Sequence, residues 1–405
     1  MSKFSLVYFL LWILFQILVE VNCQSPPFKP SVSYFHTATL LDNKLYILGG
    51  RDSSDNLVEK EFFFLDVSIP FNTQSLLWQD LSSINTLPPH NAAASVKDNT
   101  KNDTLFLYGG VTSDQTMALV YTFNSSWSIP NIAGVNPIRK NSLTGIDHDG
   151  KIYLWGGASY DGTFKNDMLI LDTINLSWGT GSSVNAPTPR DLYGATLLPN
   201  NNIVYLGGIN DVTATFSQDL IIDKGNALTL NEVYIYNTIN DSWSTQITSG
   251  NIPSNRAGFS TVLGLDGNRM IIYGGIFNNP PGYIDATLYV LDLTNFNWYV
   301  PKITGNIPKT RAYHKANVIG KYMVISFGKG YDKSVESDVL LLDISNNEEY
   351  IWTTTFELSV PNNTISKPNS SSSQLSNNNS TLTRIIAIVG SLFGSILLSF
   401  GSFLL

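Results

Sequence analysis

The chain has 405 residues, of which 24 are Lys or Arg and 32 are Asp or Glu, giving a formal net charge of -8. Only 14% of the residues are charged, while 43% are hydrophobic and 12% aromatic, a balance that excludes a disordered chain. No basic run occurs, so we expect no nucleic-acid partner. One cysteine cannot form an intramolecular disulfide, and with four histidines it offers no zinc-ligand spacing. We therefore expect no metal and no cofactor.

Residues 1–23 have the pattern of a secretory signal peptide. A basic start, Met1–Lys3, precedes an apolar run of 16 residues from Phe4 to Val19, as in the first two regions of such peptides. Small or moderately sized residues before Gln24 place cleavage after Cys23, and the mature chain then has no cysteine. The alternative is an uncleaved N-terminal membrane anchor.

The other end combines a polar segment with an apolar tail. Residues 361–384 are rich in Asn, Ser and Thr, which bury too little apolar surface to fold, and we expect a solvated stalk. The tail, 385–405, has 21 residues without a charge, enough to cross about 30 Å of hydrocarbon as a helix.

Two interpretations of this tail remain open. A retained transmembrane helix usually carries Lys or Arg on its cytoplasmic side, whereas the flanking charge here, Arg384, precedes the tail. A glycolipid (GPI) anchor signal has small residues at the attachment site, a polar spacer of about 8–12 residues and a final apolar segment. Residues 369–373, residues 374–384 and the tail follow that order, so we favour the glycolipid anchor. Both interpretations predict a membrane-anchored protein of the secretory pathway whose middle part is extracellular, at the cell surface.

The middle of the chain repeats one pattern six times: four or five apolar residues followed by Gly-Gly. The glycine pairs are Gly49 and Gly50, Gly109 and Gly110, Gly156 and Gly157, Gly207 and Gly208, and Gly274 and Gly275. In the sixth copy, which contains Gly328, we infer that the second glycine is lost. A pair of glycines lets the backbone turn at positive φ and lets a neighbouring segment approach closely.

Each copy continues into a second apolar run, a polar turn and a tryptophan. The tryptophans are Trp78, Trp127, Trp178, Trp243, Trp298 and Trp352, with spacings of 49, 51, 65, 55 and 54 residues. A period of about 50 residues is typical of propeller blades. The runs are short, rich in β-branched and aromatic residues and bounded by Gly, Asn, Asp and Ser, which predicts strands.

One further segment precedes each glycine strand, introduced in three cases by a proline turn before Arg190, Arg256 and Arg311. Counting it gives four strands per repeat. In order and spacing these motifs resemble the kelch-repeat β-propeller family across residues 31–358. The resemblance implies an all-β, six-bladed propeller with four antiparallel strands per blade.

Several features depart from a regular repeat. The segments between glycine pair and tryptophan are long in the first and fourth repeats, where we expect loops that project from the propeller. All strands of the first repeat come from the N-terminal side and all of the sixth from the C-terminal side. We therefore expect the ring to close by side-chain packing alone, without an exchanged strand.

The resemblance extends to galactose oxidase, whose propeller carries a copper radical site with a Tyr-Cys crosslink. Because Cys23 is predicted to leave with the signal peptide, no thiol remains to form that crosslink. The four histidines fall in separate repeats, where core hydrogen bonding is the better interpretation, and no nucleophile elbow or phosphate loop occurs. We therefore expect no catalytic residues and no enzymatic activity.

Eight asparagines head an Asn-x-Ser/Thr sequon and are glycosylation candidates if the chain is secreted. They are Asn102, Asn124, Asn175, Asn240, Asn362, Asn369, Asn378 and Asn379.

Propeller loops cluster at the ends of a central channel, and loops on a rigid scaffold commonly bind. Arg190, Arg256 and Arg311, with Tyr193 and Tyr313 nearby, are candidate binding residues at one mouth, since Arg and Tyr are enriched in binding hot spots. The alternative is that each arginine braces the neighbouring blade.

The leading functional hypothesis is a non-enzymatic, cell-surface kelch propeller that acts as a protein-interaction or recognition module, with a protein or glycan partner. The alternative is a glycan-binding or vestigial galactose-oxidase-like ectodomain.

Overall fold

A computed structural model describes residues 7–9, 12, 27–98, 100, 104–217, 219–280, 287–330 and 334–358. Most of the predicted signal peptide, and the whole stalk and apolar tail at 361–384 and 385–405, lie outside these residues. Within them, no helix combines the length and hydrophobicity needed to span a membrane.

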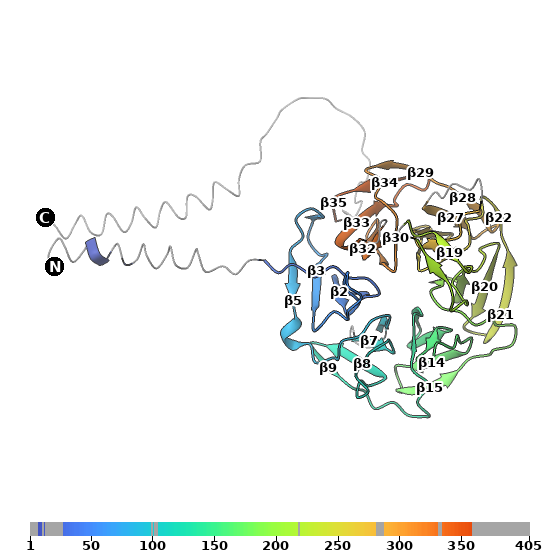
Figure 1. The fold of residues 1–405 in the computed structure, drawn as a ribbon, viewed down its shortest axis with the longest axis horizontal. Helices are drawn as coiled ribbons and strands as arrows, with labels where there is room; N and C mark the ends of the chain where they lie inside the picture. The colour runs from blue at the N-terminus through green and yellow to red at the C-terminus, as the bar shows by residue number, and fades with distance from the viewer. Residues whose placement is uncertain are drawn as a thin grey trace, which may run out of the picture. The chain divides into compact units, whose positions relative to one another are not determined.

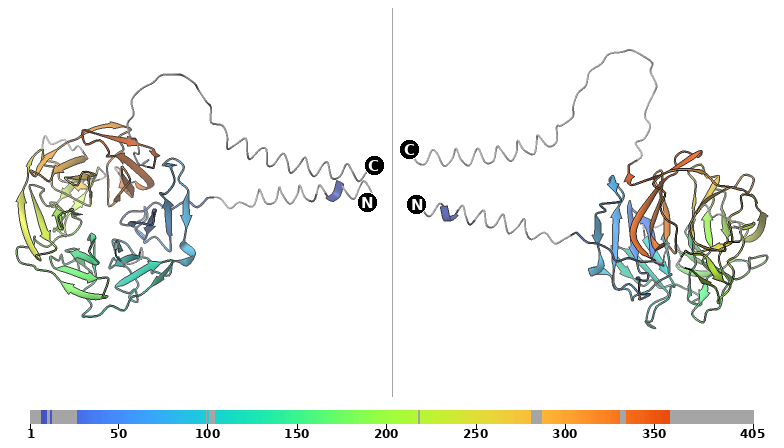
Figure 2. Two further views of the ribbon diagram at one scale, coloured as in Figure 1. Left: turned by 180° about the vertical axis from the view of Figure 1, so that it is seen from behind. Right: turned by 45° about the horizontal axis from the view of Figure 1, so that its top comes forward.

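The described chain forms a ring of six β-sheets around a central axis (Figure 1). Figure 2 shows the same ring from behind and tilted. The four main strands of the first three blades are β1 (Thr37–Leu41), β2 (Lys44–Leu48), β3 (Phe62–Asp66) and β5 (Trp78–Asp80); β6 (Ala94–Asp98), β7 (Thr104–Tyr108), β8 (Val120–Asn124) and β9 (Ser126–Ser128); and β11 (Gly145–His148), β12 (Lys151–Trp155), β14 (Met168–Asp172) and β15 (Ser177–Thr180).

The other three blades repeat this order. Their strands are β16 (Gly194–Leu197), β17 (Asn202–Leu206), β20 (Glu232–Asn237) and β21 (Ser242–Ile247); β24 (Ser260–Leu263), β25 (Arg269–Tyr273), β27 (Leu288–Asp292) and β28 (Asn297–Tyr299); and β31 (Lys315–Ile319), β32 (Tyr322–Gly330), β33 (Val335–Asp343) and β34 (Glu349–Thr353). All pair antiparallel within a blade. The predicted six-bladed propeller with four strands per blade is confirmed.

Short strands decorate the blades. They are β4 (Phe71–Asn72), β10 (Lys140–Asn141), β13 (Ala158–Ser159), β18 (Thr215–Phe216), β19 (Ile222–Lys224), β22 (Ser249–Gly250), β23 (Arg256–Ala257), β26 (Ile276–Phe277), β29 (Lys302–Gly305), β30 (Arg311–Ala312) and β35 (Thr355–Phe356). Residues Ser82–Ile84 form one turn of 3-10 helix, η1. Strands β22 and β29 run parallel to the outermost strands β28 and β34.

The core is a series of apolar layers between neighbouring blades rather than one central mass. Separate clusters of buried residues join blades 1 and 2, blades 2 to 4, blades 4 and 5, blades 5 and 6, and blades 6 and 1. Each glycine strand is the second strand of its blade and contributes to these layers on both faces. Four of the six repeat tryptophans are buried in the layers, while Trp127 and Trp178 are half-buried.

A closed ring of six backbone hydrogen bonds links the blades around the channel. A residue two or three positions before each inner strand donates its N–H to the corresponding carbonyl of the preceding blade, at 2.8–3.1 Å. The donor and acceptor pairs are Phe35 to Tyr313, Ala92 to Phe35, Ser142 to Ala92, Leu192 to Ser142, Gly258 to Leu192 and Tyr313 to Gly258. All six residues have φ between 53° and 65°, a conformation that costs non-glycine residues about 1–2 kcal/mol. The hydrogen bonds between blades therefore hold the five non-glycine residues in a backbone conformation that is unfavourable for them.

The glycine pairs form a second ring of the same kind. The N–H of the second glycine donates to a carbonyl of the next blade at 2.9–3.0 Å. The pairs are Gly50 to His90, Gly110 to Lys140, Gly157 to Arg190, Gly208 to Arg256, Gly275 to Arg311 and Gly328 to Ser33. Gly328 therefore occupies the second position, so the expected loss of the second glycine in blade 6 is wrong. It is the first glycine that is replaced, by Phe327, which keeps the left-handed backbone at φ 51°.

The junction between blades 6 and 1 also corrects the expected closure by side chains alone. Strand exchange is indeed absent from the four main strands of these blades, but the backbone bonds of both rings cross the junction. Strand β35 also pairs with β4, a strand in the blade 1 insertion. The rings of Phe71 and Phe356 stack there with centroids 4.6 Å apart.

We expect Gly109→Ala to destabilise the fold by more than about 2 kcal/mol. At φ +72°, its Cβ would collide with the carbonyl oxygen of Lys140 in the next blade. Gly162→Ala is the matched control, since Gly162 has φ +78° but nothing within 4 Å of an added Cβ. Urea unfolding of both variants measures the difference; equal losses would contradict the role of close blade approach.

Candidate functional site on the loop face

The two ends of the propeller differ in what they expose. One end, which we call the turn face, carries the connections between strands 1 and 2 of each blade and those between strands 3 and 4, which are short except for the blade 1 insertion. Backbone bonds tie these turns together in pairs, as from Thr173 to Gly150 and from Thr238 to Asn201. The other end, the loop face, carries the segments after each glycine pair and the connections between blades.

The blade 4 insertion folds over the channel at the loop face, so the expectation of a projecting loop is wrong for it. Strands β18 and β19 form a hairpin, and Ile221 bridges to Phe277 of blade 5. Leu220 is fully buried, in one apolar cluster with residues of blades 1, 5 and 6. We call this set the mouth cluster: Tyr34, Ile209, Leu220, Ile222, Ala227, Ala257, Ile276, Ala312, Tyr313 and Val335.

The three predicted binding arginines are buried, with 0–5% of their surfaces exposed. The guanidinium group of each arginine donates to the backbone carbonyl of the residue at the first glycine position of the same blade, at 3.1–3.2 Å. The acceptors are Gly207 for Arg190, Gly274 for Arg256 and Phe327 for Arg311. Their backbone carbonyls accept from the preceding blade in the second hydrogen-bond ring. Arg311 also pairs with Asp338 at 2.6 Å. This geometry supports the bracing alternative rather than a binding role.

The two predicted binding tyrosines are likewise enclosed. The hydroxyl of Tyr193 donates to the carbonyl of Trp155, and 4% of the residue is exposed. Tyr313 lies in the mouth cluster, its ring 4.2 Å from that of Phe35 and 5.9 Å from that of Phe216 in the insertion. The arginines and tyrosines do gather at one mouth, but the insertion and the blade contacts keep them from the surface.

Three of the four histidines are buried and hydrogen-bonded, as expected for core residues. His36 and His314 each hydrogen-bond a serine of a neighbouring blade, Ser326 and Ser260, at 2.8 Å. Burial lowers the pKa of His36 to about 3 and the pKa of His314 well below its usual value, and Lys315 acts in the same direction on both. They are therefore uncharged at neutral pH.

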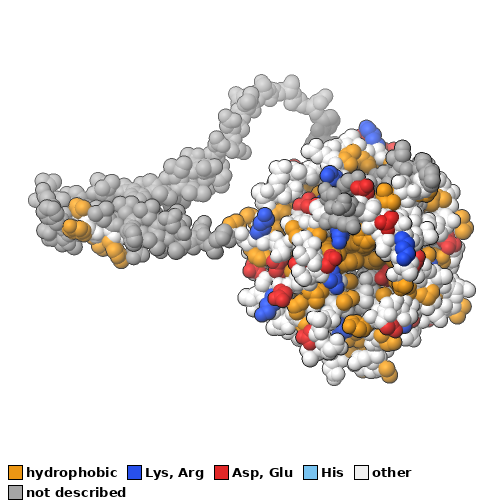
Figure 3. All heavy atoms as spheres, viewed as in Figure 1, with side chains coloured by type: hydrophobic (Ala, Val, Ile, Leu, Met, Phe, Trp, Pro, Cys, Tyr) orange, Lys and Arg blue, Asp and Glu red, His pale blue; other side chains and the backbone are white. Residues whose placement is uncertain are grey.

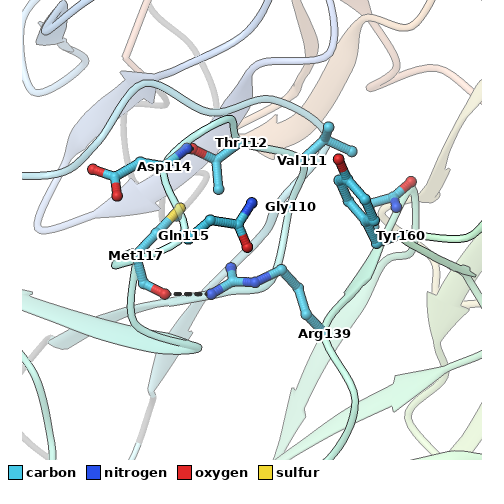
Figure 4. A pocket seen from close by; sticks show the side chains of 9 residues that line it. Gly110, Val111, Thr112, Asp114, Gln115, Met117, Arg139 and Tyr160 are labelled. Atoms are coloured by element: carbon cyan, nitrogen blue, oxygen red, sulfur yellow. Dashed lines mark hydrogen bonds between the residues drawn. The ribbon is translucent and has the colours of Figure 1, made fainter.

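An open pocket of about 290 Å³ lies on the loop face at blades 2 and 3 (Figure 4). Arg139 forms its floor and donates to the carbonyls of Gly109, Met117 and Ala118 at 2.6–3.0 Å. Gln115 points toward this guanidinium and Tyr160 lies across the pocket (Figure 4). Tyr160 is 80% exposed. The pocket thus offers an aromatic ring, an amide and a cation at the surface, the chemistry of a protein-binding hollow.

The described sequons of the propeller share the opposite end. All three are exposed: Asn124 ends strand 3 of blade 2, and Asn175 and Asn240 lie in the turns between strands 3 and 4 of blades 3 and 4. Asn102 and the four sequons beyond residue 358 lie outside the described residues. The loop face therefore carries none of the three described acceptors.

Comparison with known proteins agrees with this architecture. The sequence matches the family described as "KLHDC2/KLHL20/DRC7 Kelch-repeats domain" over residues 35–223 and 222–382. The chain belongs to the kelch-repeat family. It is similar to Kelch domain-containing protein 3 of Bos taurus, 24% identical over 334 residues that cover 76% of this chain and 84% of that protein.

The chain is also similar to a second protein in sequence and to a solved structure in fold. Acyl-CoA-binding domain-containing protein 4 of Arabidopsis thaliana is 22% identical over 348 residues, covering 82% of this chain and 48% of that protein. The solved structure of YjhT has a TM-score of 0.59 and 14% identity, covering 81% of this chain and 99% of that one. The latter supports the propeller fold alone.

Sequence reasoning on the kelch propeller missed the pocket around Arg139. Its lining comes from the loop after β7, the connection to blade 3 and the loop after β13, which carry no shared motif. The only signal in the sequence is that Arg139 stands at the start of blade 3. It lies one residue before Lys140, whose position in blade 3 corresponds to that of Arg190 in blade 4.

We expect Arg256→Met to lower the free energy of unfolding by roughly 3 kcal/mol or more, because it leaves buried carbonyls without their donor. Tyr160→Ser, at an exposed site, should change it by less than about 0.5 kcal/mol. Urea unfolding distinguishes the two. An Arg256→Met protein as stable as Tyr160→Ser would contradict the bracing role.

We expect His36→Gln to reduce the acid sensitivity of the kelch propeller. An unfolded chain protonates histidine near pH 6.5, whereas folded His36 stays neutral down to about pH 3. The stability that neutral His36 contributes is therefore complete above about pH 6.5 and is lost as the pH falls toward 3. Between pH 7 and pH 5 the variant should lose roughly 2 kcal/mol less than the wild type. Urea unfolding at both pH values measures this, and parallel losses would refute it.

Proposed function

We propose that this kelch propeller is a non-enzymatic, cell-surface interaction module that binds a protein partner with its loop face. The segregation of the two faces carries the proposal: the described sequons occupy the turn face, and the open pocket at Arg139 lies on the loop face. Glycans on a secreted chain would cover the turn face and leave the loop face free. The surface in Figure 3 also mixes acidic and basic side chains, which suits a protein partner better than a polyanion.

The location at the cell surface rests on the sequence of the two ends. The basic and apolar start favours entry into the secretory pathway, and the polar stalk with its apolar tail favours a glycolipid anchor. Sequencing the mature N-terminus should give Gln24 as the first residue, and a phosphatidylinositol-specific phospholipase should release the protein from cells. A chain that begins at Met1 would refute the cell-surface location, while one that stays in the membrane after treatment would indicate a transmembrane helix.

A glycan placed on the loop face tests the binding surface directly. Asp161→Asn creates an Asn-Gly-Thr sequon beside Tyr160, in an exposed turn whose backbone N–H at Thr163 bonds Asp161. We expect the added glycan to abolish binding of the secreted propeller to intact cells, because it would cover the pocket. Flow cytometry with a labelled, tetramerised propeller measures the binding.

The control is Asp161→Asn combined with Thr163→Ala, which keeps the first substitution but removes the sequon. It should bind like the wild type, as should Asn240→Gln on the turn face. Prior protease treatment of the cells should remove binding, whereas binding that survives protease and is lost on glycosidase treatment would support the glycan-binding alternative. Undiminished binding of the glycosylated Asp161→Asn protein would refute the loop face as the binding surface.

A further inference from the structure

The outermost strand of blade 4, β21 (Ser242–Ile247), has an open edge on the rim of the ring (Figure 1). With six residues it is the longest outermost strand, since those of the other blades have three to five. In blades 5 and 6 the connection from the preceding blade adds a parallel fifth strand, β22 or β29. In the described part of the chain, no strand covers the outer edge of β21 in this way.

Three residues of β21 direct their backbone groups toward this open edge. The N–H of Thr248, just after the strand, donates to the carbonyl of Asn231, just before β20. Along an antiparallel pair, residues alternate between those that bond the partner strand and those that do not. The backbone N–H and C=O groups of Trp243, Thr245 and Ile247 therefore face away from β20 and out of the sheet.

This edge lacks the features that usually keep an edge strand from pairing, such as Lys, Pro or a bulge. Its sequence, Ser-Trp-Ser-Thr-Gln-Ile, contains no charge and no proline, and its register with β20 is continuous. Within the described residues, one of the outward groups has a partner: the side-chain amide of Gln246 lies 3.4 Å from the carbonyl of Ile247. The Ile247 side chain is 66% exposed. Such an edge is a template for another strand.

The strand is complementary to itself when two copies run antiparallel. With Thr245 opposite Thr245 of the second copy, Trp243 faces Ile247, and all the outward N–H and C=O groups of these residues pair across the contact. Thr with Thr and Trp with Ile are cross-strand pairs that stabilise sheets. On the other face Ser244 meets Gln246, and no charges of equal sign come together. A second copy therefore satisfies both the backbone and the side chains of this edge.

We propose that two copies of this chain associate through β21, which joins blade 4 of each copy into one continuous antiparallel sheet. The contact is isologous and closes as a dimer about a two-fold axis at Thr245. Because the paired strands run in opposite directions, the loop faces of the two copies point to opposite sides. The dimer then presents the pocket at Arg139 twice. This association does not depend on the partner proposed for that pocket.

The first test exchanges charges at Thr245 in the purified full-length chain, with the mass measured by light scattering after size exclusion. Thr245→Lys sets two equal charges opposite each other and should raise the dimer dissociation constant roughly tenfold, as should Thr245→Glu. Mixing the two variants should restore the dimer, because Lys then faces Glu. Thr180→Lys is the matched control, since Thr180 is also exposed and also lies two residues after a repeat tryptophan. It should dimerise like the wild type.

Thr245 is exposed, so both variants should keep the melting temperature of the wild type, which verifies that they are folded. A wild type that stays monomeric at every concentration would overturn the proposal. Loss of the dimer in both variants without recovery on mixing would also overturn it, because Thr245 would then not face its own copy.

The second test, Thr245→Cys, traps the dimer without introducing a charge. Residues opposite each other in a hydrogen-bonded antiparallel pair have Cα atoms about 5.5 Å apart, a distance that a disulfide spans. After mild oxidation the full-length variant should give a covalent dimer on a non-reducing gel. Thr180→Cys and the wild type, whose only cysteine is Cys23, should remain monomers. A disulfide to a different protein, or no more dimer than Thr180→Cys forms, would refute self-association.

Discussion

The ring of backbone hydrogen bonds around the channel is the constraint on which the rest of the propeller depends. Five N–H groups in this ring reach a carbonyl 50 to 66 residues earlier in the chain, and the sixth bond, from Phe35 to Tyr313, closes the ring. A hydrogen bond between adjacent blades fixes both their distance and their rotation, since it demands alignment as well as proximity. The left-handed backbone at Ala92 or Leu192 is tolerated because two blades enforce it.

The glycine pairs serve this same constraint, which explains why they dominate the sequence. In blades 1 to 5 a side chain at the first glycine would strike the backbone of the next blade, so the bonds of the second ring between these blades require its absence. Where Phe327 replaces that glycine, the acceptor residue in the next blade is Ser33, whereas the other blades have a histidine, a lysine or an arginine there. The ring of Phe327 packs between His36, Phe63 and Trp78. At the junction of blades 6 and 1, where the two ends of the propeller sequence meet, the side chain of Phe327 thus adds apolar packing that a glycine could not provide.

The sequence predicted the blade number, the strand order and the glycine strands, because these depend on periodic side-chain chemistry. It did not predict the inner ring, whose members Phe35, Ala92, Ser142, Leu192 and Tyr313 have no common side chain and act through their backbones. Arg190 and its equivalents were ambiguous for a related reason: an arginine after a proline turn looks the same whether its guanidinium faces solvent or a glycine carbonyl. Only the folded blade, which places that carbonyl beside the guanidinium, decides between the two.

The insertion of blade 4 shows how one loop changes what the whole ring can bind. Around Leu220 and Ile222, both buried, Ile221 is half-buried and the flanking Asp219 and Asp223 are exposed, a pattern of packing against a surface that the length of the insertion did not reveal. By burying Tyr313 and Tyr34 it removes the aromatic mouth from solvent, so a large partner must bind the rim of the loop face, where Tyr160 and Gln115 are exposed.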